Sequence, residues 1–338
     1  MNNLLLLDCT LRDGGYVNNW NFGQDEIDII VHGLERTGIN ILELGFLRDE
    51  PFNSNSSNLP SIEIADRLLT QKREDILYSA MIEAFNPFPL NKLSSHRDGG
   101  IDLIRVCIWK RCLNEHLSYC KNIAEKGYKI TIQPSRVEQY KDDDFIDMLK
   151  KANELNPYAV YVVDTWGTQS PNQVCHYLEL SDKYLNSNVK LGYHGHNNKL
   201  QALSCAKAAI EMKLDRDLCI DASILGMGRG AGNLNTEIIM EYLNETTGTK
   251  YDFDGVINIF ISSLRKIYHK TPWGYSMFYF LCSINDCNPN YATYFSENGL
   301  SEELFLKFLH SLTENEKIVF NKGFVEDRIK NLGKGELT

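Results

Sequence analysis

The feature that most limits the fold of this chain is a regular alternation of short apolar stretches with stretches of helical periodicity. The first apolar stretch is four leucines, residues 4–7. The second, residues 39–46, follows a segment in which Ile27, Ile30 and Leu34 are spaced as on one helix face. The same order recurs until about Asn244, in eight strand and helix units of about 25 to 35 residues. Strands rich in β-branched and apolar residues, separated by amphipathic helices, indicate a parallel sheet with both faces covered.

A closed (β/α)₈ barrel, the TIM barrel, is the predicted form of that sheet. The predicted strands are residues 4–7, 39–46, 76–83, 101–109, 128–134, 159–167, 189–198 and 218–228. The predicted helices between them are residues 25–37, 61–71, 114–126, 142–155, 171–185 and 200–212, with a poorly periodic connector before the fourth strand. A doubly wound sheet is the alternative, but eight even units without G-x-G-x-x-G after the first strand favour the barrel. We therefore predict a barrel domain, residues 1–245, and a C-terminal helical domain, residues 246–338.

Polar residues gather where the predicted strands end, which is where barrels of this kind build their active sites. In chain order they are Arg12, Asp13, Glu43, Arg105, Gln133, Asp164, Thr165, His194 and His196, followed by the loop 226–233. Taken alone, the R-D-G sequence after the first strand is also a common surface turn. Of this set, we expect four residues to contact the substrate: Arg105, Gln133, Asp164 and Thr165.

The two histidines after the seventh strand, in YHGHNN, indicate a metal site. His194 and His196 are two residues apart, so on an extended chain both imidazoles point to the same side. Two inward histidines and one carboxylate make a facial triad that suits Mn²⁺, Mg²⁺, Co²⁺ or Zn²⁺. The H-x-H pattern is weak by itself, but it gains weight here because the first and seventh strands both flank the eighth in a closed barrel.

The second predicted strand and the loop after the eighth strand also contain candidate site residues. Glu43 lies inside an apolar strand, and a buried carboxylate needs a cation, so we expect it to pair with Arg12 or a metal. The loop GMGRGAGN, residues 226–233, has three open interpretations. It is a flexible connection, a phosphate cradle, or a close approach of the backbone to the metal with the Asn233 amide as a ligand or support.

Five segments together resemble the DRE-TIM metallolyases, the superfamily of 3-hydroxy-3-methylglutaryl-coenzyme A lyase, isopropylmalate synthase and 4-hydroxy-2-oxovalerate aldolase. They are LLDCTLRDGG, ILELGF, VVDTWG, GYHGHNN and GMGRGAGN, and the resemblance spans residues 4–237. GMGRGAGN is most similar to the hydroxy-oxovalerate aldolases. The lyases carry a longer loop with a catalytic cysteine there, whereas Cys219 of this chain lies inside the predicted eighth strand.

The resemblance implies a role for each matching residue. It makes Asp13, His194 and His196 the metal ligands, Arg12 the catalytic arginine and Glu43 the acidic residue that orients it. Asn233 is implied as a further ligand or neighbour of the metal. Of the divalent ions, Mn²⁺ is the one we expect first, with Mg²⁺, Co²⁺ and Zn²⁺ as alternatives.

Two tyrosines are catalytic candidates on weaker grounds. Tyr16 stands where the aldolases have a histidine that is proposed as the base. Because a tyrosine is a poor base at neutral pH, either it works through a water, or another group takes the proton, or the substrate differs. Lining the pocket is the alternative role for Tyr16. Tyr275, in WGYSMF, is similarly placed to a pocket tyrosine in the C-terminal domain of the aldolases, and the alternative is a core aromatic.

The composition of the chain limits the classes of molecule that it is expected to bind. The net charge is −10 and no stripe of Lys and Arg is present, so nucleic acid and anionic membrane surfaces are disfavoured. The N-terminus lacks a basic segment, no apolar run is long enough to span a membrane, and the nine cysteines are scattered and odd in number. We therefore expect a cytoplasmic protein with reduced thiols that acts on small molecules. The resemblance adds a homo-oligomer, a dimer, and an aldehyde dehydrogenase as a partner.

The function that we predict is a divalent-metal-dependent aldolase, a lyase that acts through a pyruvate-type enolate on a 4-hydroxy-2-oxo acid or a related substrate. Its small-molecule partners would be a 2-oxo acid and an aldehyde. A Claisen-type synthase of the isopropylmalate and homocitrate branch, which uses an acyl-coenzyme A, is the first alternative. An aldolase subunit that depends on a partner, and passes its aldehyde to a dehydrogenase, is the second.

Overall fold

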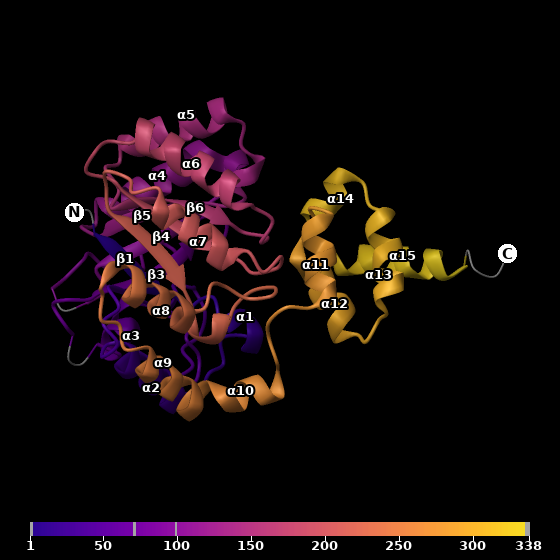
Figure 1. Cartoon of the computed structure of the whole chain (residues 1–338), viewed down its shortest axis with the longest axis horizontal. Coiled ribbons are helices and arrows are strands. Elements are labelled where there is room, and N and C mark those ends of the chain that lie inside the picture. The colour runs from indigo at the N-terminus through magenta and orange to yellow at the C-terminus, as the bar shows by residue number, and fades with distance from the viewer. Residues whose placement is uncertain (1–2, 70–71, 99, 335–338) are drawn as a thin grey trace.

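The computed structural model describes residues 3–69, 72–98 and 100–334, and its main body is a closed parallel barrel of eight strands in sequential order (Figure 1). This confirms the predicted (β/α)₈ fold. The strands are β1 Leu4–Asp8, β2 Ile41–Phe46, β3 Leu77–Glu83, β4 Leu103–Ile108, β5 Lys129–Pro134, β6 Ala159–Asp164, β7 Lys190–Gly195 and β8 Leu218–Ala222. The pairing of Leu4 with Leu218, and of Asp8 with Ala222, closes the ring between β1 and β8.

Helices cover the outside of the barrel. They are α2 Gln24–Leu34, α3 Ile62–Arg67, α4 Leu113–Ala124, α5 Asp142–Asn153, α6 Pro171–Tyr184, α7 Ala202–Glu211 and α8 Thr236–Thr247, with a short α1, Gly15–Asn18, after β1. Local sequence explains several helix starts: Ser170 and Gln173 form a capping box around Pro171 at the start of α6. Residues 70 and 71, where the second predicted helix should end, lie outside the described residues.

The three last strands are shorter than predicted, because their polar ends leave the sheet. β6 ends at Asp164, β7 at Gly195 and β8 at Ala222, so the residues that follow form loops at the carboxyl end of the barrel. His196 and Asn233 meet there in an isolated antiparallel bridge. These loops hold most of the residues that we singled out from the sequence.

Two apolar cores stabilise the barrel, one inside it and one beneath the helices. The inner core includes Leu7, Ile41, Leu103, Tyr161 and Cys219, all at most 1% exposed. The outer core lies between the strands and the helices and is much larger. Burial of apolar side chains on both faces of every strand is what the continuous apolar stretches require.

After α8 the chain first stays on the barrel. Helices α9 Phe253–Ile259 and α10 Arg265–Lys270, joined by the π-helical turn Phe260–Leu264, follow the outside of α2 and α8. Val256, Ile259 and Leu264 belong to the outer core of the barrel. The predicted boundary at residue 245 stays a prediction, but the packing attaches these helices to the barrel side.

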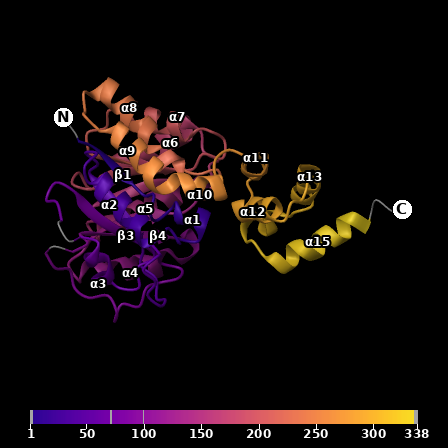
Figure 2. The same ribbon diagram turned by 90° about the horizontal axis from the view of Figure 1, so that it is seen from below.

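A separate helical body follows, to one side of the barrel in both views (Figures 1 and 2). It contains α11 Met277–Ile284, α12 Pro289–Glu297, α13 Glu302–His310, α14 Glu314–Ile318 and α15 Lys322–Lys334. Its own core includes Phe295, Phe305 and Phe308. Within the described part of the chain, no helix is long and apolar enough to cross a membrane.

Candidate active site

The turn after β1 carries the first two site residues into the carboxyl end of the barrel. The backbone N–H of Asp13 donates to the carbonyl of Cys9 at 2.8 Å, which closes the turn. Thr10 fixes the turn to the loop after β8, because its hydroxyl accepts the N–H of Ile224 at 2.8 Å. As a result Arg12 and Asp13 are 4% and 2% exposed, so the R-D-G sequence forms no surface turn.

Asp13, His194 and His196 lie together as the sequence predicted. One ligand atom from each falls within 4.8 Å of the others, and all three residues are buried. The Nε2 atom of His194 is 3.6 Å from Oδ2 of Asp13, and Nε2 of His196 is 3.6 Å from Oδ1. These separations are too long for hydrogen bonds and leave space for an ion between the three groups.

The Nδ1 atom of each imidazole, on the side away from Asp13, has a hydrogen-bond partner. Nδ1 of His194 is 3.0 Å from Oδ2 of Asp221, and Nδ1 of His196 is 2.9 Å from the backbone carbonyl of Asp164. A hydrogen bond of this kind makes Nδ1 the protonated nitrogen and turns the lone pair of Nε2 inward, as metal-binding histidines require.

Asn233 approaches the same point from the loop 226–233. Its Nδ2 donates to the carbonyl of Met227 at 3.2 Å, and its Oδ1 is buried with no hydrogen-bond partner among the described residues. A Cβ on Gly228 would clash with the Asn233 amide and lie 2.8 Å from Oδ1 of Asp13. The backbone of this loop therefore lies against Asp13, as the third interpretation requires.

Arg12 lies between two carboxylates. Its Nε donates to Oε2 of Glu43 at 2.7 Å, which bears out the expected pairing, and its Nη1 donates to Asp13. Its Nη2 is buried and has no partner among the described residues. A guanidinium fixed on two sides with a free donor on the third can bind an oxygen anion next to the carboxylate and histidine cluster.

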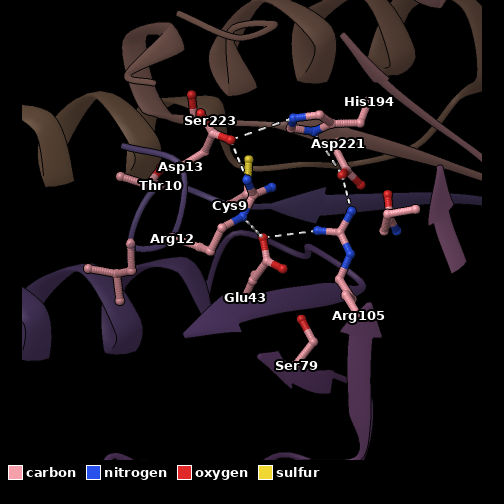
Figure 3. Close-up of polar contacts among 12 residues, drawn as sticks. Cys9, Thr10, Arg12, Asp13, Glu43, Ser79, Arg105, His194, Asp221 and Ser223 are labelled. Carbon is pink, nitrogen blue, oxygen red and sulfur yellow. Dashed lines mark hydrogen bonds and ion pairs between the residues drawn. The ribbon is translucent and has the colours of Figure 1, made fainter. Parts of the chain in front are cut away.

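A chain of buried charges connects Arg12 with His194 through the interior of the barrel (Figure 3). Oε2 of Glu43 is also 2.9 Å from Nη1 of Arg105, whose Nη2 in turn donates to Asp221, the residue behind His194. The sequence reasoning missed Asp221, although a carboxylate in an apolar strand is the signal that drew attention to Glu43. Arg105, expected to contact substrate, is fully buried and faces these two carboxylates; its substrate role stays a prediction.

The charges around the cluster shift its protonation. Burial raises the pKa of Asp13, but the Arg12 cation and the two histidines outweigh it and hold that pKa well below its ordinary value. Burial lowers the pKa of His196 below its ordinary value and outweighs the attraction of Asp13. A carboxylate that is ionised and an imidazole that is neutral are the forms that bind a metal ion.

Tyr16 lies beside this cluster on α1. Its ring contacts those of Trp20 and Phe46 edge to face, with centroids 4.8 and 6.4 Å away. Burial raises the pKa of the Tyr16 phenol well above its ordinary value, and the nearby Glu83 raises it further. The phenol therefore stays protonated at neutral pH and is not a base there.

The other predicted residues are more scattered. Gln133 is buried and donates to the Thr131 hydroxyl at 2.9 Å. Asp164 accepts backbone N–H groups of its own loop, while burial and Glu138 raise its pKa to about 7. The Thr165 hydroxyl accepts the N–H of Arg136 at 2.9 Å. Tyr275 is 50% exposed on the connection to α11, and its ring lies 6.3 Å from that of Phe280.

Comparison with known proteins agrees with this geometry. The HMGL-like family model matches residues 107–260. The chain is 27% identical to an oxaloacetate decarboxylase of Mycobacterium tuberculosis over 241 residues, which cover 71% of this chain and 69% of that protein. It is 24% identical to a 4-hydroxy-2-oxovalerate aldolase of Geobacillus genomosp. 3 over 245 residues, which cover 71% and 70% of the two chains.

A solved structure extends the likeness beyond the barrel strands. The N-terminal domain of a candidate aldolase from Bacteroides vulgatus superposes with a TM-score of 0.74 at 27% identity. The superposition covers 87% of this chain and 96% of that one. These matches agree with the resemblance carried by the five sequence segments.

Proposed function

We propose that the chain, which carries a match to the HMGL-like family model, is a DRE-TIM metallolyase and acts as an aldolase that makes or breaks a carbon–carbon bond beside a pyruvate-type enolate. We propose that it depends on a divalent metal ion, as this family does. The observation that carries the proposal is the cluster of Asp13, His194 and His196 next to the free Nη2 donor of Arg12. The substrate that we propose is a 4-hydroxy-2-oxo acid or a close relative of one.

The residues fit a divalent ion. Nε2 of His196 and Oδ1 of Asn233 are both buried without a hydrogen-bond partner in the described part of the chain, which is costly unless something binds them. We propose Asp13, His194 and His196 as ligands, with Asn233 as a fourth ligand or close neighbour. A carboxylate, an amide oxygen and two imidazoles suit Mn²⁺, and also Mg²⁺, Co²⁺ or Zn²⁺.

When bound, the ion supplies a Lewis acid that polarises the keto group of the 2-oxo acid and orients its carboxylate. The protein supplies the rest of the charge stabilisation. Arg12 donates from Nη2 to the oxygen on which negative charge develops, and Glu43 holds the guanidinium in place from the far side. A preorganised donor of this kind commonly contributes a few kcal/mol, roughly 3, to the stability of the transition state.

In the cleavage direction the C3–C4 bond of the substrate breaks and its electron pair remains on the pyruvate fragment as the enolate. The 4-hydroxyl loses its proton and becomes the carbonyl of the aldehyde, and a proton added at C3 completes pyruvate. We propose that Tyr16 donates a hydrogen bond to the substrate oxygen, since its phenol stays protonated. The hydroxyl of Tyr16 has no hydrogen-bond partner among the described residues that would compete.

The experiment that tests this function is exchange of the pyruvate methyl protons in D₂O, followed by proton NMR. The purified protein is loaded with Mg²⁺ or Mn²⁺, and the paramagnetic ion is removed before the spectrum is read. We expect exchange that needs the ion and that falls by about 100-fold or more in Arg12→Ala, as losses of single electrostatic donors do. His194→Ala should lose the ion and the exchange together.

The matched control is His176→Ala, which removes an exposed histidine of α6 that pairs with Asp142 and lies outside the site. It should exchange pyruvate protons at the wild-type rate. Metal-loaded protein that exchanges no protons would contradict the aldolase proposal. Turnover of acetyl-coenzyme A would then support the Claisen-type synthase.

Decarboxylation of oxaloacetate is a second candidate, favoured by the 27% identical relative that bears this activity in its name. Loss of carbon dioxide from C4 leaves the same pyruvate enolate, so the same residues serve. Release of carbon dioxide from oxaloacetate, measured beside aldol turnover, distinguishes the two candidates.

The dimer, the dehydrogenase partner and the cytoplasmic location stay predictions from the sequence. Light scattering of the purified chain tests whether it is a dimer.

A further inference from the structure

We propose that Arg229 binds a second anionic group of the substrate, so that the aldehyde half of the molecule carries a carboxylate or a phosphate. The inference rests on the proposed aldolase function and adds to it the class of the aldehyde. It is carried by the position of Arg229 beside Tyr16, by its lack of a carboxylate partner, and by the free donor of Arg12 on the same side of the barrel.

The backbone of Arg229 is fixed directly on the metal-binding cluster. Its N–H donates to Oδ1 of Asp13 at 2.9 Å. From that point the side chain extends past Tyr16, with the guanidinium carbon 5.6 Å from the ring centroid. Its Nη2 reaches Oδ1 of Asn290, on α12 of the helical body, at 3.3 Å. The cation therefore lies between the carboxyl end of the barrel and the C-terminal helices.

The charge of Arg229 is not neutralised by the protein. Among the residues that the structure describes, its one side-chain hydrogen bond is to the neutral amide of Asn290, and its Nε is buried without an acceptor. Four other arginines around the site each pair with a carboxylate: Arg12 with Glu43, Arg48 with Glu83, Arg105 with Asp221 and Arg136 with Glu138. A partly buried guanidinium with an open donor is the arrangement that binds carboxylates and phosphates.

Arg12 and Arg229, each with a free donor, lie at the two ends of one aromatic pair. The guanidinium of Arg12 is 5.7 Å from the Phe46 ring, and that of Arg229 is 5.6 Å from the Tyr16 ring. The two rings contact each other at 6.4 Å. A substrate whose reacting end is bound by Arg12 would extend past the Tyr16 ring toward Arg229, which selects an anionic group at its far end.

The test compares ligands that differ only in that distal group. Three 2-oxo acids serve: 2-oxopentanoate, which ends in a methyl group, 2-oxoglutarate, which ends in a carboxylate, and 2-oxo-4-phosphonobutanoate, which ends in a phosphonate. Their dissociation constants are measured by calorimetry on the Mg²⁺-loaded full chain. We expect at least one of the two anionic ligands to bind about tenfold or more tightly than 2-oxopentanoate, because hydrogen bonds between ions are strong. The tighter of the two identifies the carboxylate or the phosphate.

Variants assign that preference to Arg229. Arg229→Gln should bring the ratio of the dissociation constants to within about threefold, and Arg229→Lys, which keeps the charge, should retain part of it. Arg136→Gln is the matched control, since it removes another arginine that links the barrel to the helical body but is paired with Glu138 and Asp286. It should keep the wild-type ratio.

The outcomes separate the inference from the function on which it rests. Equal affinity of the wild-type protein for all three ligands overturns the inference, as does a preference that Arg229→Gln retains. If pyruvate protons fail to exchange, the aldolase proposal fails, while the calorimetric ratio still decides whether Arg229 binds an anion. If Arg229→Gln does not fold, Arg229→Lys and the wild-type ratio decide.

Discussion

Oδ2 of Asp221 lies 3.0 Å from Nδ1 of His194, and the same carboxylate pairs with Arg105. A residue of β8 thus orients a histidine of β7 and neutralises an arginine of β4. Burial raises the pKa of Asp221, but Arg105 and His194 outweigh it and lower that pKa below its ordinary value. Asp221 is therefore an anion in the folded protein and supports the lone pair that His194 turns toward Asp13.

The first prediction concerns metal affinity. Asp221→Asn removes the anion behind His194, so the affinity for Mn²⁺ should fall by about 10- to 100-fold, as it does when such supporting residues are replaced. Titration calorimetry of the metal-free protein measures the change. Asp217→Asn, next to β8 and paired with Lys190, is the matched control and should bind Mn²⁺ as the wild type does. Equal affinities in both variants would exclude this role for Asp221.

The second prediction concerns stability. Glu43→Gln leaves Arg12 and Arg105 without their shared carboxylate, and removing one partner of a buried ion pair costs about 3 to 5 kcal/mol. The free energy of unfolding in urea should fall by that amount. Asp75→Asn breaks an exposed pair with Arg73 and should change it by less than about 1 kcal/mol. Similar losses in the two variants would show that the buried chain of charges is not a major source of stability.

The third prediction concerns pH. Asp8 is buried at the end of β1 and accepts hydrogen bonds from Thr236 and Thr10; burial outweighs these bonds and raises its pKa to about 6. Because the folded state holds this proton more tightly than the unfolded chain, the contribution of Asp8 is full below about pH 4 and is lost as the pH rises to about 6 and above. One pKa unit corresponds to about 1.4 kcal/mol, so the loss is about 3 kcal/mol.

The measurement compares the wild type with Asp8→Asn in urea between pH 4 and pH 8. The difference between their free energies of unfolding should change by about 3 kcal/mol in favour of the variant as the pH rises. The change should be centred near pH 5, between the two pKa values. Parallel curves for the two proteins would mean that Asp8 titrates alike in the folded and unfolded states.

The fourth prediction concerns the loop after β8. Gly228→Ala puts a Cβ against the Asn233 amide and Oδ1 of Asp13, so it should displace both groups and weaken Mn²⁺ binding by about tenfold or more. Gly323→Ala, on α15, is the control because its nearest neighbour is an Asn321 side chain at 3.5 Å. Calorimetry on both variants gives the comparison. Wild-type affinity in Gly228→Ala would mean that the loop adjusts without cost.

Much of the fold is predictable from the sequence because each strand is recognisable from its own apolar residues. Residues 4–7, for example, are apolar at every position, which suits a strand covered on both faces, and eight mostly apolar runs leave few arrangements. The packing of α9 and α10 against α2 was not predictable in this way. It depends on tertiary contacts, such as that between Ile259 and Gly33, which no local pattern reports.

The site was predictable where its residues are local to one strand end and not where they meet across the barrel. Asp13 lies in the turn after β1, and His194 and His196 lie at the end of β7 and just after it, so the barrel brings them together. Arg105 and Asp221 are 116 residues apart and meet only because β4 and β8 face one another through the interior. The distance between Arg229 and Tyr16 depends on the path of a glycine-rich loop, which the sequence does not determine.

The chain of charges inside the barrel also restricts how this protein could be recombined with its relatives. Arg12, Glu43 and Arg105 come from the first half of the barrel, and Asp221 and His194 from the second. A half-barrel exchanged with a relative must bring a cation opposite Asp221 or an anion opposite Arg105. Compatible halves are therefore selected by the signs of their interior charges as well as by the register of the strands at the seam.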